Sequence, residues 1–259
     1  MRIDAHMHVA GNLASVGWRG KWTDDRVVIE AADRLEIDQL CCSIPIQGLD
    51  NPRPDGMREV NDSVIHAMGR FPGRILGYAF LDPRFQHEAR DEIDRCVLKH
   101  GMMGVKLYNQ CRCWDPMVLP IVERCIELRV PILHHGGKQT PVSGRPWQAY
   151  RSDSDDFARL ARLYPEVTII EGHPIVGDWE WAIKTLRDVP NVYVDTSGSL
   201  NDDGFIEMAV RQLGTGRVLF ATDVSMEAGV GKVLGAAITA RQRKGIFGEN
   251  MRRIMQQRV

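Results

Sequence analysis

Two histidines, His6 and His8, stand one residue apart in the first segment of the chain, which reads Arg-Ile-Asp-Ala-His-Met-His-Val from position 2. Alternate residues of a β-strand point to the same face, so a strand here would place Asp4, His6 and His8 on one face. Imidazole is the commonest side-chain ligand of metal ions, and two that converge on one point are a typical start of a zinc-type site. The triplet alone also fits two exposed histidines, so the rest of the chain has to decide.

Further metal-capable side chains stand at the ends of other apolar segments. His134 and His135 end one such segment, and His173 follows the next. Asp223 ends the last of them. Five of the eight histidines therefore fall where strands are expected to end, which favours the metal interpretation. The other three lie in helical patterns and are expected to serve packing or the surface: His66, His87 and His100.

Short apolar segments alternate with longer amphipathic ones along the whole chain. We expect eight strands, at 3–8, 39–44, 75–81, 104–108, 131–135, 167–171, 192–196 and 218–222. Helical periodicity predicts helices between them, at about 24–35, 56–69, 86–99, 115–128, 152–163, 178–187, 202–213 and 228–240. A final segment, 245–259, also has a helical pattern.

Repeated strand–helix alternation predicts an α/β fold with a parallel sheet. Eight units in 259 residues, without a low-complexity linker, favour a single-domain (β/α)8 TIM barrel over residues 1–259. The longer irregular stretches, 11–23, 45–55, 109–114 and 136–151, all follow strands. In such a barrel these loops build the active-site face, so we expect the chemistry at the carboxyl ends of the strands.

Composition restricts the partners of this protein. The chain is 44% hydrophobic and 26% charged with a formal net charge of −1, so neither nucleic acid nor an anionic membrane is expected as a partner. No apolar run approaches the ~20 residues of a membrane span. The six cysteines show no zinc-ribbon spacing, and the pair Cys111 and Cys113 is interpreted as two thiols without a metal or redox role. We expect a cytoplasmic protein that acts on a small molecule, and allow for a homo-oligomer.

Several segments in order resemble the amidohydrolase superfamily, specifically its amidohydrolase-2 branch of TIM-barrel metal-dependent hydrolases and related decarboxylases. The matching segments are Asp-Ala-His-Met-His (4–8), Gly-Val-Lys-Leu-Tyr (104–108), Pro-Ile-Leu-His-His-Gly-Gly (131–137), Glu-Gly-His-Pro (171–174), Val-Leu-Phe-Ala-Thr-Asp (218–223) and Gly-Glu-Asn (248–250). The resemblance covers essentially the whole chain. It is specific for the fold and the metal site and says little about the substrate.

The resemblance implies one divalent metal, held by His6, His8, the histidine of the fifth strand and Asp223. His134 and His135 are adjacent, so only one can face the barrel interior. The family motif places the ligand before a small residue and glycine, which selects His135. Three imidazoles and a carboxylate suit Zn²⁺, with Mn²⁺ or Fe²⁺ as alternatives.

The same resemblance implies roles in catalysis. The metal would activate a water molecule, Asp223 would accept and return its proton, and His173 would orient the nucleophile or polarise a carbonyl. Lys106 is either a buried ion-pair lysine, a substrate contact or a carbamate. Asp4 and Asp195 are candidates to orient the ligand histidines. Ser197, like Asp195, ends the seventh strand, where a polar residue can also serve structure alone.

Arginine and tryptophan in the long loops indicate the substrate class. Arginine matches carboxylate geometry and tryptophan offers a flat apolar wall, which suggests a small carboxylated or aromatic molecule. With Lys106, the candidates for substrate binding are Trp18, Arg112, Arg145 and Trp147.

We expect hydrolysis of an amide, lactone or ester bond, with non-oxidative decarboxylation of an aromatic or unsaturated acid as the alternative. A non-catalytic barrel that binds metal or a metabolite is a third hypothesis. By the same resemblance, the compact chain mildly favours hydrolysis, because decarboxylases of this branch usually have longer chains with extra helices in their loops.

Overall fold

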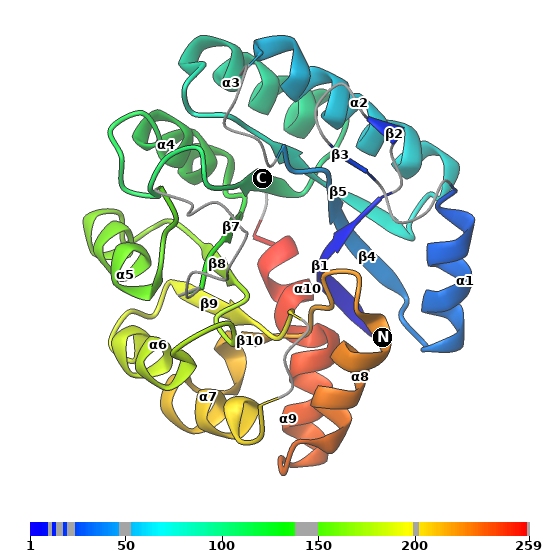
Figure 1. Cartoon of the computed structure of the whole chain (residues 1–259), viewed down its shortest axis with the longest axis vertical. Helices are drawn as coiled ribbons and strands as arrows, with labels where there is room; N and C mark the ends of the chain where they lie inside the picture. Colours follow the sequence, from blue (N-terminus) through cyan, green and yellow to red (C-terminus); the bar gives the residue numbers. More distant parts are fainter. Residues whose placement is uncertain are drawn as a thin grey trace.

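The structure is a computed structural model that describes residues 1–9, 12–13, 18–19, 24–46, 53–137, 150–198 and 202–257. Eight parallel strands surround a central axis, and helices form a ring outside them (Figure 1). In their order around the barrel the strands are β1 (Ile3–His8), β4 (Gln39–Ser43), β5 (Ile75–Phe80), β6 (Gly104–Leu107), β7 (Ile132–His135), β8 (Ile169–Gly172), β9 (Val192–Asp195) and β10 (Val218–Leu219). All eight strands expected from the sequence are present, so the predicted TIM barrel is confirmed.

Two hydrogen bonds close the barrel between β1 and the segment after β10. The backbone N–H of Ala5 donates to the carbonyl of Phe220 at 2.9 Å, and the N–H of Asp223 donates to the carbonyl of His6 at 2.8 Å. A short antiparallel pair, β2 (Asn12–Leu13) and β3 (Trp18–Arg19), lies within the long loop after β1 and was not expected from the sequence.

The helices cover the outer face of the barrel. They are α1 (Arg26–Arg34), α2 (Pro54–Arg70), α3 (Gln86–Ile93) with a π-helical extension (Asp94–Lys99), α4 (Leu119–Leu128), α5 (Ser154–Leu163), α6 (Trp179–Leu186), α7 (Phe205–Leu213), α8 (Met226–Gly235), α9 (Ala240–Lys244), a second π-helical segment (Gly245–Glu249) and α10 (Asn250–Met255). The helix predicted at 228–240 is wrong at its end. The chain is extended at Ala236, and α9 begins at Ala240. Its N-cap residue Thr239 forms a capping box with Gln242. Among the described helices, none has the length and apolar character needed to cross a bilayer.

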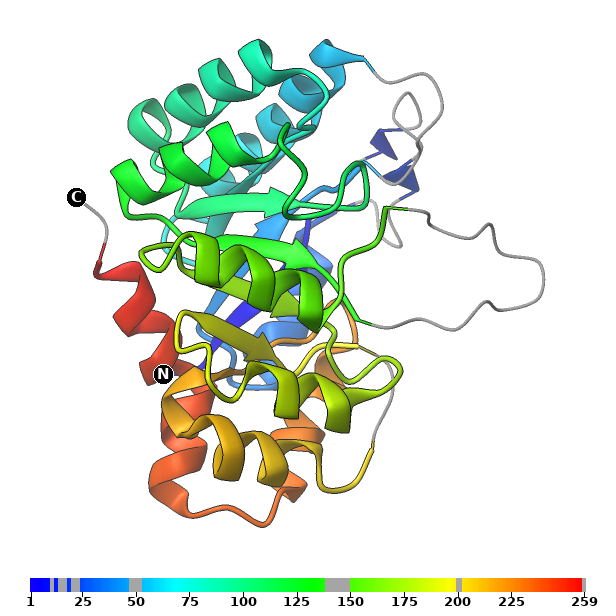
Figure 2. The same cartoon turned by 90° about the vertical axis from the view of Figure 1, so that its left-hand side faces the viewer.

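The lower part of the barrel interior is apolar. Side chains from six of the strands and from the segments beside them pack there with two residues of α10. The cluster consists of Ile3, Ala5, Cys41, Tyr78, Met103, Leu133, Ile170, Leu219, Ala221, Met251 and Ile254. A TIM barrel is filled in this way by layers of side chains. The predicted C-terminal helical segment therefore closes the bottom of the barrel, where α10 (red) lies at the end opposite the strand arrowheads in Figure 2. Polar side chains remain for the layer at the carboxyl ends of the strands.

A β-bulge in β1 changes which side chains face the interior. Between Asp4 and Met7 the pairing with β4 shifts by one residue, because Asp4 lies opposite Leu40 whereas Met7 lies opposite Cys42. Ala5 packs in the interior cluster, while Asp4 and the sulfur of Met7 both meet Thr222. The expectation that Asp4 shares one face with His6 and His8 is therefore wrong, because the extra residue turns Asp4 outward.

Glu171, on the outer side of β8, is a buried carboxyl group that contacts the start of α5. Both of its oxygens accept hydrogen bonds from the hydroxyl of Ser154, at 2.8 and 2.9 Å. Burial raises its pKa from 4.5 to about 8, and the Ser154 hydrogen bond offsets only part of this effect. Folding therefore favours the protonated form of this side chain at neutral pH.

Replacing Glu171 with glutamine is expected to protect the fold against rising pH. Because the folded-state pKa is raised, the stability that Glu171 contributes is fully present below pH 4.5 and is lost as the pH rises toward 8. The stability of Glu171→Gln relative to wild type should increase by about 1 kcal/mol per pH unit across this window. Urea unfolding with chelator at pH 5, 6, 7 and 8 measures this difference. The matched control is Glu166→Gln at an exposed position, and an equal pH response of the two variants would contradict the prediction.

Candidate active site

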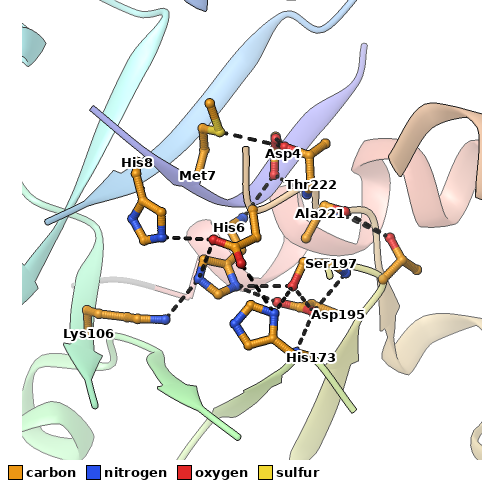
Figure 3. A network of polar contacts seen from close by, with 12 residues as sticks. Asp4, His6, Met7, His8, Lys106, His173, Asp195, Ser197, Ala221 and Thr222 are labelled. Atoms are coloured by element: carbon orange, nitrogen blue, oxygen red, sulfur yellow. Dashed lines mark hydrogen bonds and ion pairs between the residues drawn. The ribbon is translucent and has the colours of Figure 1, made fainter. Parts of the chain in front are cut away.

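Four of the predicted site residues, His6, His8, Lys106 and His173, lie together at the carboxyl ends of the strands (Figure 3). His6 and His8 lie on β1, Asp223 follows β10, and His173 follows β8. Within the described residues, the ligand atoms of His6, His8 and Asp223 lie within 4.8 Å of one another. The structure thus brings together three of the four predicted metal ligands from the two ends of the chain.

The hydrogen bonds of His6 and His8 determine which ring nitrogen of each can bind a cation. His6 Nδ1 lies 2.9 Å from Asp195 Oδ2, and His8 Nδ1 lies 2.9 Å from the carbonyl oxygen of Ser43. A carbonyl oxygen and an ionised carboxylate only accept hydrogen bonds, so each Nδ1 carries the hydrogen. Burial and the neighbouring Lys106 charge also lower the pKa of His6 to about 3, which keeps its ring neutral. His6 therefore presents an Nε2 lone pair, and Nε2 is the nitrogen of His8 that is not engaged by the Ser43 carbonyl.

These Nε2 atoms converge on the carboxylate of Asp223. His8 Nε2 lies 2.9 Å from Asp223 Oδ1, and His6 Nε2 lies 4.0 Å from the same oxygen. Burial alone would raise the pKa of Asp223, but the neighbouring His173, His8 and His6 outweigh it and hold the pKa well below its usual range. Lone pairs and an ionised carboxylate that face one another need a cation or a proton between them. The donor set fits a divalent metal ion.

His135 adds a third imidazole to this region, and His134 does not. The His134 ring packs against Phe157 of α5 at 5.1 Å, and its Nδ1 donates to the carbonyl of His135 at 2.7 Å. The His135 ring instead lies 4.8 Å from that of His173 and 4.2 Å from that of Tyr108. Its buried Nε2 has no hydrogen-bond partner among the described residues, although it lies outside the His6–His8–Asp223 group. A buried imidazole nitrogen without a hydrogen-bond partner, next to His6, His8 and Asp223, supports the view that these residues hold a metal ion.

Lys106 extends from β6 to the same point. It is fully buried, and its Nζ lies 2.9 Å from His6 Nε2. Burial lowers its pKa to about 8, although the carboxylates of Asp223 and Asp195 oppose this shift. The ammonium group places a positive charge against the lone pair of His6, as a metal would. No carboxylate lies within 4.0 Å of it in the described part of the chain, so it does not form the close ion pair that was one interpretation of this lysine.

His173 and Asp223 adopt backbone conformations that are rare for residues with side chains. The φ angles are +61° at His173, +45° at Asp223 and +69° at the adjacent Val224, all in the left-handed region. Such strain costs about 1–3 kcal/mol per residue and clusters at functional sites. The N–H of His173 is held by Asp195 Oδ1 at 3.0 Å, and that of Asp223 by the carbonyl of His6. The strained backbone therefore fixes the direction in which both side chains enter the site.

Asp195 and Asp4 hold the site in different ways. Asp195 binds the ring of His6, as expected of a residue that orients a ligand. Burial would raise its pKa, but hydrogen bonds from His6 and Ser197 and the nearby imidazoles keep it well below the usual value. Asp4 contacts no ligand ring and instead accepts bonds from the backbone N–H of His6 and from the N–H and hydroxyl of Thr222. It thereby joins β1 to the segment that ends at Asp223.

The predicted substrate-binding residues are only partly placed. Arg112 lies 3.6 Å from Asp156 at the start of α5, in an ion pair that the sequence did not indicate. Arg145 and Trp147 lie outside the described residues, as does the side chain of Trp18. Lys106 alone of these candidates contacts the histidine–aspartate group in the part of the chain that the structure describes.

A comparison with protein families gives the classification. A family model described as amidohydrolase, of the amidohydrolase-2 type, matches residues 3–255. The chain belongs to the amidohydrolase-2 family. The resemblance seen in the sequence motifs is therefore confirmed over nearly the whole chain.

Members and structures similar to this amidohydrolase-2 chain include aromatic-acid decarboxylases. The gamma-resorcylate decarboxylase of Polaromonas sp. (strain JS666 / ATCC BAA-500) is 25% identical over 221 residues, covering 66% of this chain and 66% of that enzyme, slightly under two thirds of its length. The crystal structure of 2,6-dihydroxybenzoate decarboxylase from Rhizobium has a TM-score of 0.78 at 18% identity and covers 98% of both chains. Dihydroxybenzoic acid decarboxylase from Polaromonas sp. JS666, with bound manganese and the inhibitor 2-nitroresorcinol, has a TM-score of 0.73 at 19% identity and covers 98% of this chain and 96% of that one.

These likenesses bear on the choice between hydrolysis and decarboxylation. Named relatives favour the alternative, decarboxylation, over hydrolysis. One of these similar structures holds manganese, and the histidine–aspartate group of this chain suits a divalent ion.

Proposed function

We propose that this amidohydrolase-2 protein is a metal-dependent non-oxidative decarboxylase of a small aromatic carboxylic acid. The observation that carries the proposal is its sequence similarity to gamma-resorcylate decarboxylase, in a chain that retains a histidine–aspartate group suited to a divalent ion. His6, His8, His135 and Asp223 are the residues proposed to hold the metal. When bound, the metal would supply a Lewis acid that neutralises negative charge on the substrate.

The charges of the site suit an anionic substrate. The Lys106 ammonium is buried and contacts the neutral ring of His6, so a substrate carboxylate would add a favourable partner in a region of low dielectric. Tyr108, stacked on His135, offers an aromatic ring beside the same region. Both residues lie on or directly after β6, which we propose as the strand that positions the acid.

Decarboxylation requires a proton on the ring carbon that carries the carboxylate. The proton adds to this carbon, the bond to the carboxylate breaks, and carbon dioxide leaves. Asp223 is the residue proposed to take up and deliver the proton, because its side chain is 27% exposed whereas that of His6 is 1% exposed. Its Oδ2 lies 3.6 Å from His173 Nδ1, so His173 stabilises the ionised carboxylate between proton transfers.

A direct assay distinguishes this reaction from hydrolysis. Protein loaded with Mn²⁺ or with Zn²⁺ is incubated with 2,6-dihydroxybenzoate and other hydroxybenzoates, and in parallel with lactones and N-acyl compounds. We expect carbon dioxide and the corresponding phenol in equal amounts from at least one hydroxybenzoate, with no release after the metal is removed by chelation. Turnover of a lactone or N-acyl compound, without carbon dioxide from any aromatic acid, would replace decarboxylation with hydrolysis. The variant Asp223→Asn provides the blank for both reactions.

A further inference from the structure

The hydroxyl of Ser197 lies between the carboxylate of Asp195 and the ring of His173 (Figure 3). Ser197 Oγ is 2.6 Å from Asp195 Oδ1 and 2.9 Å from His173 Nδ1. All three residues are buried, and Asp195 and Ser197 are completely inaccessible. His6, His173 and Asp195 also form a group close enough to hold a metal. However, Nδ1 of His6 is already hydrogen-bonded to Asp195, and Nδ1 of His173 is joined to Asp195 through the Ser197 hydroxyl.

The single hydrogen of the Ser197 hydroxyl determines the direction of these bonds. Asp195 Oδ1 is an acceptor that already receives the backbone N–H groups of His173 and Ser197, each at 3.0 Å. A 2.6 Å contact between two oxygens requires a hydrogen between them, and an ionised carboxylate has none to give. The Ser197 hydroxyl therefore donates to Asp195, and its oxygen accepts from His173. This requires the hydrogen of His173 on Nδ1.

A second neighbour of the same nitrogen leads to the same assignment. Asp223 Oδ2 lies 3.6 Å from His173 Nδ1, so a hydrogen on this nitrogen would also lie close to a second carboxylate oxygen. The other oxygen of Asp195, Oδ2, receives the Nδ1 hydrogen of His6. One buried carboxylate thus orients two imidazoles, one directly and one through a serine hydroxyl.

We propose that Asp195 and Ser197 form a positioning pair that holds His173 as its Nδ1–H tautomer and leaves the Nε2 lone pair for substrate or a transferred proton. The inference rests on the proposed function for its catalytic consequence, while the tautomer itself is independent of the reaction. Without the hydroxyl of Ser197, the Nδ1–H form loses its 2.9 Å acceptor, and the two neutral tautomers become closer in energy. His6 keeps its own bond to Asp195 and retains its tautomer.

Nitrogen NMR of the histidine rings tests the tautomer. Protein with ¹⁵N-labelled histidine is loaded with diamagnetic Zn²⁺, and the His173 signals are identified by their loss in His173→Gln. We expect the Nδ1–H pattern in wild type and a mixed pattern for His173 in Ser197→Ala. His134 is the internal reference, because its Nδ1 donates to a carbonyl in both proteins. A wild-type His173 with its hydrogen on Nε2, or a Ser197→Ala spectrum unchanged from wild type, would overturn the inference.

Two further variants separate positioning from a loss of structure. Thr196→Val removes a neighbouring buried hydroxyl that bonds the backbone of Ala221, so it should lower the melting temperature without changing the His173 pattern. Ser197→Thr keeps a hydroxyl and should preserve the Nδ1–H form of His173. Its spectrum therefore tests the inference even if Ser197→Ala does not fold. A mixed His173 pattern in Thr196→Val or in Ser197→Thr would count against the pair.

Kinetics then connect the tautomer with the reaction. Ser197→Ala should lower kcat by about 10–100-fold with KM changed less than about threefold, and Ser197→Thr should restore most of the loss. If the tautomer shifts as expected but the wild type releases no carbon dioxide from aromatic acids, the proposed function fails and the positioning pair stands. If carbon dioxide is released and Ser197→Ala keeps the kcat of wild type, the catalytic part of the inference is wrong.

Discussion

Asparagine in place of Asp223 is expected to abolish most turnover while leaving the barrel folded. The amide keeps the shape of the side chain but carries no negative charge, so it neither binds a divalent cation well nor takes up a proton. General acid–base groups contribute about 10²–10⁴-fold, and the added loss of a metal ligand places the expected decrease in kcat/KM at ~10³-fold or more. Steady-state assay of the substrate found in the screen, together with metal analysis, measures the effect.

The positive φ of Asp223 raises the question of whether Asp223→Asn stays folded. Asp223 has a φ of +45°, which asparagine tolerates better than other residues, so the melting temperature of Asp223→Asn should stay close to that of wild type. The matched control is Asp202→Asn, an exposed aspartate at the start of the segment leading to α7. It removes the same charge and should retain activity within about twofold of wild type, as expected for a surface change. Activity of Asp223→Asn close to that of wild type would refute its proton-transfer role.

Loss of His8 is expected to remove the metal. Its Nδ1 is held by the Ser43 carbonyl, and its Nε2 lies 2.9 Å from Asp223 Oδ1. Alanine therefore deletes one ligand and also removes the ring that faces the Asp223 carboxylate. Even residues that only orient a ligand cost 10–100-fold in metal affinity, and a direct ligand should cost more than about 100-fold. After dialysis without chelator, wild type should retain about one equivalent of divalent metal and His8→Ala almost none.

Metal content is a measurement independent of the substrate. Elemental analysis and competition with a coloured chelator give the stoichiometry and affinity of both proteins. His66→Ala, at an exposed position of α2, is the control for loss of a histidine outside the site. Equal metal content in His8→Ala and wild type would exclude His8 as a ligand, and absence of metal affinity from wild type itself would remove the basis of the proposed function.

The sequence was sufficient for the barrel because its signals are local. Apolar runs such as Val167-Thr168-Ile169-Ile170 and the helical spacing between them depend on neighbours a few residues apart, so they predict the elements well. Where a helix ends depends on capping interactions that the apolar pattern does not show. The break after α8 was missed because the helical periodicity continues past it, whereas the capping box at Thr239 starts a new helix. The β1 bulge was also missed, since an extra residue against β4 exists only once the two strands are paired.

The candidate site was anticipated in part. Histidines and an aspartate at strand ends were visible as a pattern, and the barrel makes such ends neighbours. Ser197 carried no distinctive signal, because a serine after a strand is common and its importance lies in two contacts, with Asp195 and with His173. The contact of Asp4 with Thr222 could not be read from the sequence for a related reason, because Thr222 is 218 residues away.

The sequence by itself determined the eight-stranded barrel, the family and the kinds of side chain available at its rim, because periodicity and residue type are written along the chain. Only the tertiary structure decided which nitrogen of His6 and His8 faces Asp223, which of His134 and His135 lies beside them, and that Lys106 reaches the same point. These are questions of direction and distance between segments up to 218 residues apart. Hydrogen-bond partners answer them, since a ring nitrogen that donates to Asp195 or to the Ser43 carbonyl leaves only the other nitrogen for a metal.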